Sequence, residues 1–380
     1  MAADIRMSIE ETTTVIAVQY RKMVVVRSRT HIMSSQQSKE RQQQMRYFSN
    51  SEFQTFKRCK RKWWLGWFRG LRPLVQSRIG AGPLGTTVHR ALAPLYVPGN
   101  FIHEDIVDAY GNPRVGPVDP RETLEQLVRV VKTEVIESWA HDPQSADAEL
   151  TELDKQNDYA RAMIDGYMRW LEETGADSDY EVLGSEVLVT YEFAEGKMLI
   201  GRLDARVRRI SDGVRLFIDH KTCANFPDLL RSLQASEQMP TYLLLERADA
   251  ALSEERTHGA IFNGLRKVKR TVNAKPPFFD RFDKTYNEHE LMSQWSRIHG
   301  QVADIEAVEV RLERGESHLT VAYPTKTRDC HWQCEFYPVC PMFDDGSRAE
   351  DMLAAIYKVG GQLDRYPELT GGKDMIEVDE

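Results

Sequence analysis

The sequence predicts an α/β fold in which helical insertions surround a mixed sheet. Three observations lead to this prediction. Helical periodicity dominates residues 53–173, apolar and polar residues then alternate over residues 182–219, and helix and strand signals follow one another after that. A run of strands flanked by helices on both sides is typical of a sheet that is covered by helices.

Composition agrees with a folded protein but says little about its partners. The chain has 380 residues, of which 41% are hydrophobic and 28% charged, so it can form one large domain or two ordinary ones. A formal net charge of -8 gives no support for a nucleic-acid partner. It does not exclude one either, because binding needs only a local basic track. No apolar run reaches the ~18 residues that a membrane span requires, so we expect no membrane association and a cytoplasmic location.

The first half of the chain is predicted to be helical after a distinct N-terminal stretch. We interpret residues 1–46 as an N-terminal extension, which the Gln- and Ser-rich run 34–44 could make flexible. Ser49 and Glu52 have the spacing of a capping box and predict a helix over 53–67. Further helices are expected after the Gly-Pro break at 80–83 and in a helical insertion around 98–175. Their ranges are 84–96, 119–139 and 150–173, with a loop over 98–119.

The second half is predicted to supply the sheet. Alternating residues and Gly-containing turns indicate an antiparallel series over 182–193, 198–210 and 214–219. We expect a helix over 236–247, a strand over 259–265 and a long helix over 288–314. The cysteine-containing segment 330–340 closes a domain that spans 47–345, and residues 346–380 form an acidic C-terminal tail.

A carboxylate and lysine cluster is the strongest chemical signal. Asp219 and Lys221 are two residues apart on a predicted strand, so their side chains share a face. A hairpin can bring Asp204 beside them, and two converging carboxylates suit Mg²⁺ or Mn²⁺. The lysine could orient or deprotonate a water. The alternative is a plain surface ion pair. The apolar neighbours at 216–218 instead favour a buried strand, and burying charged groups costs free energy that a functional role would explain.

Four short motifs together resemble the RecB-like branch of the PD-(D/E)XK nucleases. From the N-terminus they are Gly85-x-x-x-His89, Gly201-x-x-Asp204, Asp219-x-Lys221-Thr and Gln238-x-x-x-Tyr242. This is the order in which that branch shows them. The resemblance implies a restriction-endonuclease-like fold. It also implies a metal held by His89, Asp204, Asp219 and the main-chain carbonyl of His220. The same resemblance assigns catalytic roles to Asp204, Asp219, Lys221, Gln238 and Tyr242, with Glu186 as a weaker candidate near a second metal.

The cysteines suggest a second metal site. Cys330-x₃-Cys334-x₅-Cys340 is a tight cluster, and the distant Cys59 completes a four-thiol set suited to zinc or to a 4Fe-4S cluster. His331 is a competing ligand. Cys223 is left over and is interpreted as a small buried apolar residue.

One cysteine before the core and three after it is similar to iron–sulfur RecB-like nucleases, which include CRISPR-associated exonucleases. The resemblance implies a 4Fe-4S cluster that joins the N- and C-terminal segments. Those relatives often have two residues between the first two clustered cysteines, whereas this chain has three, so zinc stays an alternative.

Two basic segments are candidate nucleic-acid contacts. The first, residues 57–67, combines basic residues with tryptophans at positions 63, 64 and 67, and the second is residues 266–270. Cations together with aromatic rings suit the binding of single-stranded nucleic acid. The alternative is that the cations form a solvated face and the tryptophans pack around the cysteine site. The candidate contacts are Lys57, Arg58, Lys60, Arg61, Arg266, Lys267, Lys269 and Arg270.

These observations lead to one expected function and two alternatives. We expect a Mg²⁺- or Mn²⁺-dependent exonuclease acting on DNA ends or single strands. By resemblance, it would serve recombination, repair or replication in a bacterial or phage-infected cell, alongside a recombination or replication protein. The alternatives are a structure-specific endonuclease and a non-catalytic DNA-binding scaffold with a structural metal cluster. No phosphate-binding Gly-rich Lys-Ser/Thr loop is present in the sequence, so helicase activity would need another chain.

Overall fold

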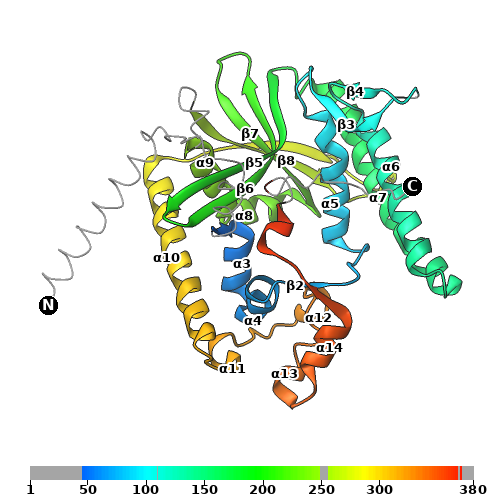
Figure 1. The fold of residues 1–380 in the computed structure, drawn as a ribbon. Coiled ribbons are helices and arrows are strands. Elements are labelled where there is room, and N and C mark those ends of the chain that lie inside the picture. The colour runs from blue at the N-terminus through cyan, green and yellow to red at the C-terminus, as the bar shows by residue number, and fades with distance from the viewer. Residues whose placement is uncertain (1–44, 109, 249–255, 367–368, 370–380) are drawn as a thin grey trace, which may run out of the picture. The chain divides into compact units, whose positions relative to one another are not determined.

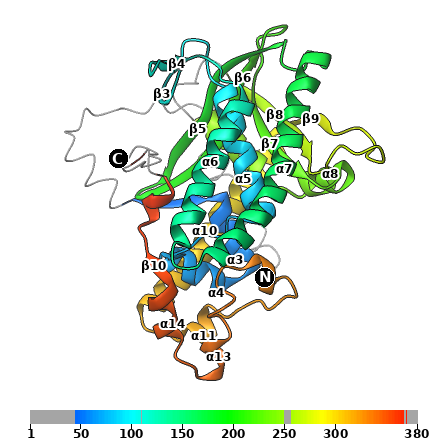
Figure 2. The same ribbon diagram turned by 90° about the vertical axis from the view of Figure 1, so that its right-hand side faces the viewer.

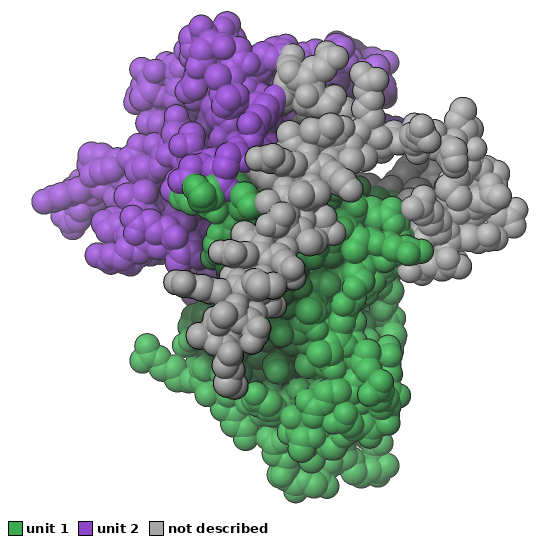
Figure 3. All heavy atoms as spheres, turned by 90° about the vertical axis from the view of Figure 1, so that its left-hand side faces the viewer, with its two compact units in different colours: residues 1–76, 190–201, 289–380 green, residues 77–189, 202–288 purple. Residues whose placement is uncertain are grey.

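A computed structural model of the chain describes residues 45–108, 110–248, 256–366 and 369 (Figure 1). The expected N-terminal extension therefore lies almost wholly outside the described residues. The chain divides into two compact units, which are coloured separately in Figure 3. Unit 1 comprises residues 1–76, 190–201 and 289–380, and unit 2 comprises residues 77–189 and 202–288.

A mixed sheet forms the centre of unit 2. Strand β6 (Lys197–Arg209) pairs antiparallel with β7 (Arg215–Cys223), and β7 pairs parallel with β8 (Thr257–Arg266). On one side β8 pairs antiparallel with β9 (Phe279–Thr285), and on the other β5 (Tyr180–Ala194) pairs with β6. The three strands predicted over 182–219 and the strand over 259–265 are confirmed. Strand β9 was not predicted.

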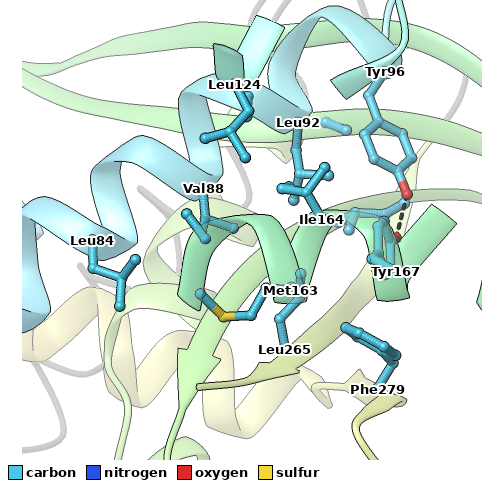
Figure 4. Close-up of a cluster of buried hydrophobic side chains, with 14 of the residues drawn as sticks. Leu84, Val88, Leu92, Tyr96, Leu124, Met163, Ile164, Tyr167, Leu265 and Phe279 are labelled. Carbon is cyan, nitrogen blue, oxygen red and sulfur yellow. Dashed lines mark hydrogen bonds between the residues drawn. The ribbon is translucent and has the colours of Figure 1, made fainter. Parts of the chain in front are cut away.

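Helices cover both faces of this sheet. On one face, α5 (Ala81–Leu92), α6 (Pro120–Ser138) and α7 (Pro143–Thr174) lie side by side (Figure 2). Their apolar side chains pack with those of β6 to β9 in one buried cluster (Figure 4). On the other face, α8 (Phe226–Gln234) and α9 (Gln238–Ala248) contact the sheet. In β7 the even-numbered Leu216 and Ile218 join the buried cluster, whereas Phe217 contacts Tyr242 of α9.

The segment 98–119 differs from its predicted loop. It contains an antiparallel pair, β3 (Ile102–Val107) with β4 (Pro113–Val115), after a 3-10 turn at Ala93–Leu95. These strands are short and largely exposed, so their sequence lacks the apolar alternation of a buried strand. Helix α7 also begins earlier than predicted, because the Asp142 side chain accepts from Ser145 N and Pro143 occupies the first turn.

Unit 1 begins with a short strand and a broken helix. Strand β1 (Arg46–Ser49) pairs parallel with the start of β6, and α3 (Asn50–Arg58) follows with Ser49 as its N-cap. The predicted helix 53–67 is interrupted at Cys59, which adopts an extended backbone. Its thiol accepts from Lys62 N and so caps α4 (Lys60–Trp63), which runs into a π-helical turn at Trp64–Phe68.

Apart from residues 190–201, at the ends of β5 and β6, the rest of unit 1 comes from the C-terminal third of the chain. Helix α10 (Glu288–Glu313) matches the predicted long helix. The expected acidic tail contains regular structure as far as residue 365, including α14 (Ala349–Ile356) and β10 (Tyr357–Val359), which pairs with β2 (Leu71–Pro73). The other short elements are α11 (His318–Val321), α12 (Cys330–Gln333), α13 (Met342–Asp345) and a 3-10 turn at Gln362–Arg365. None of the helices in the described ranges is long and apolar enough to cross a membrane.

Candidate active site

Strand β7 presents Asp219 and Lys221 to the face that α9 covers. Asp219 is 3% exposed, and its Oδ2 lies 2.8 Å from Lys221 Nζ. Burial raises the pKa of the Asp219 carboxyl, an effect that Lys221 opposes and the negative charge of Asp204 reinforces. For Lys221, burial lowers the pKa of the ammonium, but the charges of Asp219 and Asp204 outweigh burial and raise it. The two side chains therefore form an ion pair between a buried carboxylate and a half-buried lysine that stays cationic.

Asp204 and His89 form a second pair beside the first. Asp204 Oδ2 accepts a 2.7 Å hydrogen bond from the main-chain N–H of His220 and lies 3.3 Å from His89 Nδ1. Burial alone would raise the pKa of Asp204, but the hydrogen bond and charge of His89 lower it. Burial opposes protonation of His89, yet Asp204 raises its pKa, and Asp219 adds to this effect. All four predicted groups therefore interact at one site.

Helix α9 supplies the last two predicted members of the cluster. Gln238 and Tyr242 are one helical turn apart. Gln238 Oε1 accepts from Lys221 Nζ at 3.1 Å, and its Nε2 lies 3.4 Å from Asp219 Oδ1 and 3.1 Å from Tyr242 Oη. Burial raises the pKa of Tyr242 to about 12, so its hydroxyl stays protonated. Gln238 thus holds the lysine and the carboxylate in a defined orientation.

Glu186 lies on β5 in an uncommon backbone conformation. Its φ of 48° is the sole positive value among the non-glycine residues that the structure describes. The neighbouring Ser185 hydroxyl donates to the main-chain carbonyls of Ala93 and Asp204, at 2.7 and 3.4 Å. Such a conformation costs on the order of 1 kcal/mol and is concentrated at functional sites. It keeps Glu186 among the candidates for the site.

The side chain of His220 points to the opposite face of β7 from Asp219, into a polar network that the sequence did not reveal. Burial lowers the pKa of His220 to about 3, so the imidazole is neutral. Its Nδ1 lies 2.8 Å from Asn263 Nδ2, which also donates to Tyr167 Oη at 2.9 Å. Asn263 Oδ1 accepts from Arg281 Nε at 3.1 Å. The sole signal in the sequence was a polar Asn263 within an otherwise apolar strand.

Arg281 is the cation that completes this network. Its guanidinium donates to Tyr167 Oη at 2.8 Å and Tyr96 Oη at 3.1 Å, and it lies 2.6 Å from Asp177 Oδ1. The two tyrosine hydroxyls also hydrogen-bond to each other (Figure 4). Because the main-chain N–H of His220 binds Asp204, the network positions the strand that carries the predicted metal ligands.

Replacing Arg281 with methionine is expected to cost about 3 kcal/mol of unfolding free energy, because several buried polar groups lose their partner. The matched change Arg231→Met removes an exposed guanidinium that is paired with Asp228 and should cost no more than about 0.5 kcal/mol. Urea denaturation of both variants measures the difference. Equal stabilities would show that the network contributes nothing to the fold.

The four predicted cysteine ligands line one cavity in unit 1. The cavity has a volume of about 200 Å³, and all five cysteines of the chain are free thiols. Burial raises the pKa of Cys334 to about 11, and burial also raises that of Cys340, with Cys59 adding to both shifts. Cys330 differs, because hydrogen bonds from Thr327 lower its pKa. Cys223 is buried elsewhere, as expected of a small apolar residue.

Only some of the predicted nucleic-acid contacts of unit 1 are exposed to solvent. Arg61 is 1% exposed and pairs with Asp344 at 2.8 Å, so it serves the fold and not a surface. Trp63 and Trp64 are buried, which supports the packing alternative for these rings. Lys57 and Arg58 are exposed, and Lys60 is half-buried with its ammonium over Phe56 and Tyr323.

The second basic segment follows β8 in unit 2. The Arg266 guanidinium donates hydrogen bonds to the main-chain carbonyls of Lys275 and Pro277, at 2.9 and 2.7 Å. Lys269 pairs with Asp158, and Arg270 lies over the rings of Phe278 and Phe279. Lys267 is half-buried. Arg266, Lys269 and Arg270 could approach a phosphate only by exchanging some of these contacts.

Both sites contain side chains of types that bind metal ions. Carboxylates and an imidazole are donors that Mg²⁺ and Mn²⁺ accept, and thiols suit zinc or iron. In the described part of the chain, no group of three or more His, Cys, Asp or Glu residues is arranged so that it could hold a metal ion. In this conformation Lys221 pairs with Asp219, and the His89 imidazole lies beside Asp204. The donor chemistry therefore fits, whereas coordination requires these ion pairs to open.

Comparison with known proteins identifies a family. A family model described as the PD-(D/E)XK nuclease superfamily matches residues 47–341. The match covers most of the chain and includes every predicted metal ligand from Cys59 to Cys340. No curated protein matches the chain.

Proposed function

This chain belongs to the PD-(D/E)XK nuclease superfamily, and we propose that it is a Mg²⁺- or Mn²⁺-dependent deoxyribonuclease that degrades DNA from ends or in single strands. One observation carries the proposal. The buried Asp219 carboxylate and the half-buried Lys221 ammonium are held by Gln238 beside the Asp204–His89 pair. Buried charges are costly unless they serve a purpose, and two carboxylates with a lysine suit phosphodiester hydrolysis.

The proposed ligands are the side chains of His89, Asp204 and Asp219 with the main-chain carbonyl of His220. A bound ion would polarise a phosphoryl oxygen and lower the pKa of a water. Lys221 is cationic and fixed through Gln238, so it can orient the attacking water and offset the charge that develops on the phosphate. Glu186 is proposed as an additional carboxylate at the edge of this site.

Linear and circular single strands distinguish an exonuclease from an endonuclease. An exonuclease should shorten a linear strand that carries a label at one end and leave a closed circle of the same sequence intact, because a circle offers no end. The measurement is gel separation after incubation with Mn²⁺ or Mg²⁺, with a chelator as control. Rapid cutting of the circle would replace the proposal with a structure-specific endonuclease.

A 4Fe-4S cluster is the proposed occupant of the cysteine cavity, held by Cys59, Cys330, Cys334 and Cys340. The support is that all four thiols line one cavity, and thiolates are the ligands that such clusters use. The cluster would join α4 to the C-terminal segment. Its proposed role is therefore to stabilise unit 1, and it takes no part in hydrolysis.

DNA is the proposed macromolecular partner, with a role in recombination, repair or replication. The proposed phosphate contacts are the exposed Lys57, Arg58 and Lys269 and the half-buried Lys267. Because such contacts act through charge, binding should weaken steeply as salt concentration rises. A recombination or replication protein could act alongside the nuclease.

A further inference from the structure

A polar cavity in unit 1 is separate from the candidate active site and from the cysteine site. Its volume is about 450 Å³, within the ~300–1,000 Å³ range of small-molecule sites. Three stretches of chain form its walls: residues 46–72, the end of α10 at 309–313, and residues 359–366. No residue of the proposed nuclease or cluster chemistry lines it.

Two glycines allow the C-terminal segment to close this cavity. Gly360 N donates to Gly70 O at 2.9 Å, just beyond the β2–β10 pair. Gly70 has a φ of +64°, and a Cβ on it would lie 2.3 Å from Gly360 O. Any larger residue at position 70 would push the two segments apart. The cavity is thus a built feature of the fold.

Most of the charged groups around the cavity already have partners. Arg46 pairs with Glu52 and, at 2.9 Å, with Glu309. Arg69 makes a bidentate pair with Glu350, at 2.8 and 2.9 Å. These contacts neutralise two of the four arginines that line the wall.

Arg72 and Arg365 differ from the other two arginines. Arg72 donates to Gly361 O at 2.9 Å and Arg365 to Gly66 O at 3.1 Å, and neither is ion-paired with an acid among the residues that the structure describes. Burial lowers the pKa of Arg365, and the positive charge of Arg72 lowers it further. Arg72 also lies opposite Lys358 in the β2–β10 register. Glu313 adds a negative charge to the same wall, but within the described residues the two guanidiniums carry no paired carboxylate and so are the wall groups that can bind an added anion.

The chemistry of the walls indicates which anion. Guanidinium groups bind phosphate through paired N–H donors, and the Arg365 guanidinium is held in place over Trp67, 4.2 Å from the ring centroid. Tyr47 and Tyr366 add aromatic surface to the same cavity. We propose that the Arg72–Arg365 cavity binds the phosphate of a nucleotide-sized ligand, either a free nucleotide or the terminal nucleotide of a DNA strand.

Calorimetric titration of the full chain in a chelator tests this proposal without DNA hydrolysis. The probes are dAMP, deoxyadenosine, and a short single strand that ends in either a phosphate or a hydroxyl. We expect the phosphate-bearing member of at least one pair to bind more tightly. Arg72→Gln and Arg365→Gln should each weaken that binding about tenfold or more, the loss expected for a charge-assisted hydrogen bond.

The matched control is Arg348→Gln, because Arg348 lies in the same unit, outside the cavity, and pairs with Asp351 on the surface. It removes the same charge and should leave the affinity unchanged. Tight binding of dAMP would identify a free nucleotide as the ligand, and a preference confined to phosphate-ended strands would identify a strand end. Equal binding of all phosphate and hydroxyl probes, or unchanged affinity in both arginine variants, would overturn the proposal.

Chemical protection of the wild-type protein covers the case in which a variant fails to fold. Phenylglyoxal modifies accessible arginines, and peptide mapping locates the modified residues. The preferred phosphate probe should slow modification of Arg72 and Arg365 but not of Arg348. Equal modification of all three with and without the probe would contradict the proposal. Because no step uses Asp219 or a divalent ion, this result is independent of the proposed nuclease activity.

Discussion

Replacing Lys221 with methionine is expected to lower the rate of DNA hydrolysis about 10²–10⁴-fold, the range for loss of a positioned group that handles a proton or charge at the reacting centre. Methionine keeps most of the length and apolar surface of the side chain but removes the ammonium that lies 2.8 Å from Asp219. The measurement is the initial rate of release from an end-labelled single strand at saturating Mn²⁺.

Lys155→Met provides the control for this variant. Lys155 is 61% exposed on α7 and pairs with Glu152, so its loss removes a lysine of the same unit without touching the site. Its rate should equal that of the wild type. If the Lys221 and Lys155 variants both retain the wild-type rate, the cluster around Asp219 has no catalytic role.

Replacing Cys334 with serine is expected to remove the metal chromophore and to lower the Tm by about 10 °C or more. A hydroxyl is a poor substitute for a thiolate ligand, and a structural metal site contributes its binding free energy to folding. Residues within 59–65 and 324–341 line the cavity, so a metal site there would hold these two segments together. Its loss should therefore destabilise unit 1 first. Visible absorbance, iron and zinc analysis, and thermal melting of anaerobically purified protein measure these effects.

Cys223→Ser separates a ligand effect from a general loss of thiol. Cys223 is the fifth cysteine, and it lies at the end of β7 and does not line the cavity. That variant should keep the colour and metal content of the wild type. Zinc without iron in the wild type would retain the four-cysteine site and change its occupant. Full metal content in the Cys334 variant would remove Cys334 from the ligand set.

The sequence predicted the elements whose patterns are strong and local. Strands β5 to β8 and helices α6 and α10 have clear periodicity, and the Asp-x-Lys spacing on β7 was sufficient to place Asp219 and Lys221 on one face. Helix α8 was missed although Asn225 caps it and Pro227 occupies its first turn, because the helix has only nine residues. Strand β9 was missed because this edge strand has four charged and only two apolar residues, so it lacks the apolar alternation that indicates a strand.

What the sequence could not predict depends on contacts between distant residues. The Ser49 cap was predicted, but Glu52 turns away from the reciprocal bond and its carboxylate accepts from Trp63 Nε1 at 2.9 Å. Arg61 looked like a free cation, yet its partner Asp344 comes from the other end of the chain. The network around Asn263 and Arg281 joins α7, β7, β8 and β9, which are far apart in the sequence, so no local motif reveals it. Such pairings follow from the tertiary fold alone.

The measurement that tests the central claim most directly is a titration of Mn²⁺ and Mg²⁺ into anaerobically purified protein with end-labelled single-stranded DNA. If the Asp204–Asp219–Lys221 cluster is a nuclease centre, degradation should be absent in a chelator and should rise to saturation with added ion. The Asp219→Asn variant should stay inactive at every concentration. A wild-type protein that binds DNA but cuts neither linear nor circular strands with either ion would contradict the account and favour a non-catalytic scaffold.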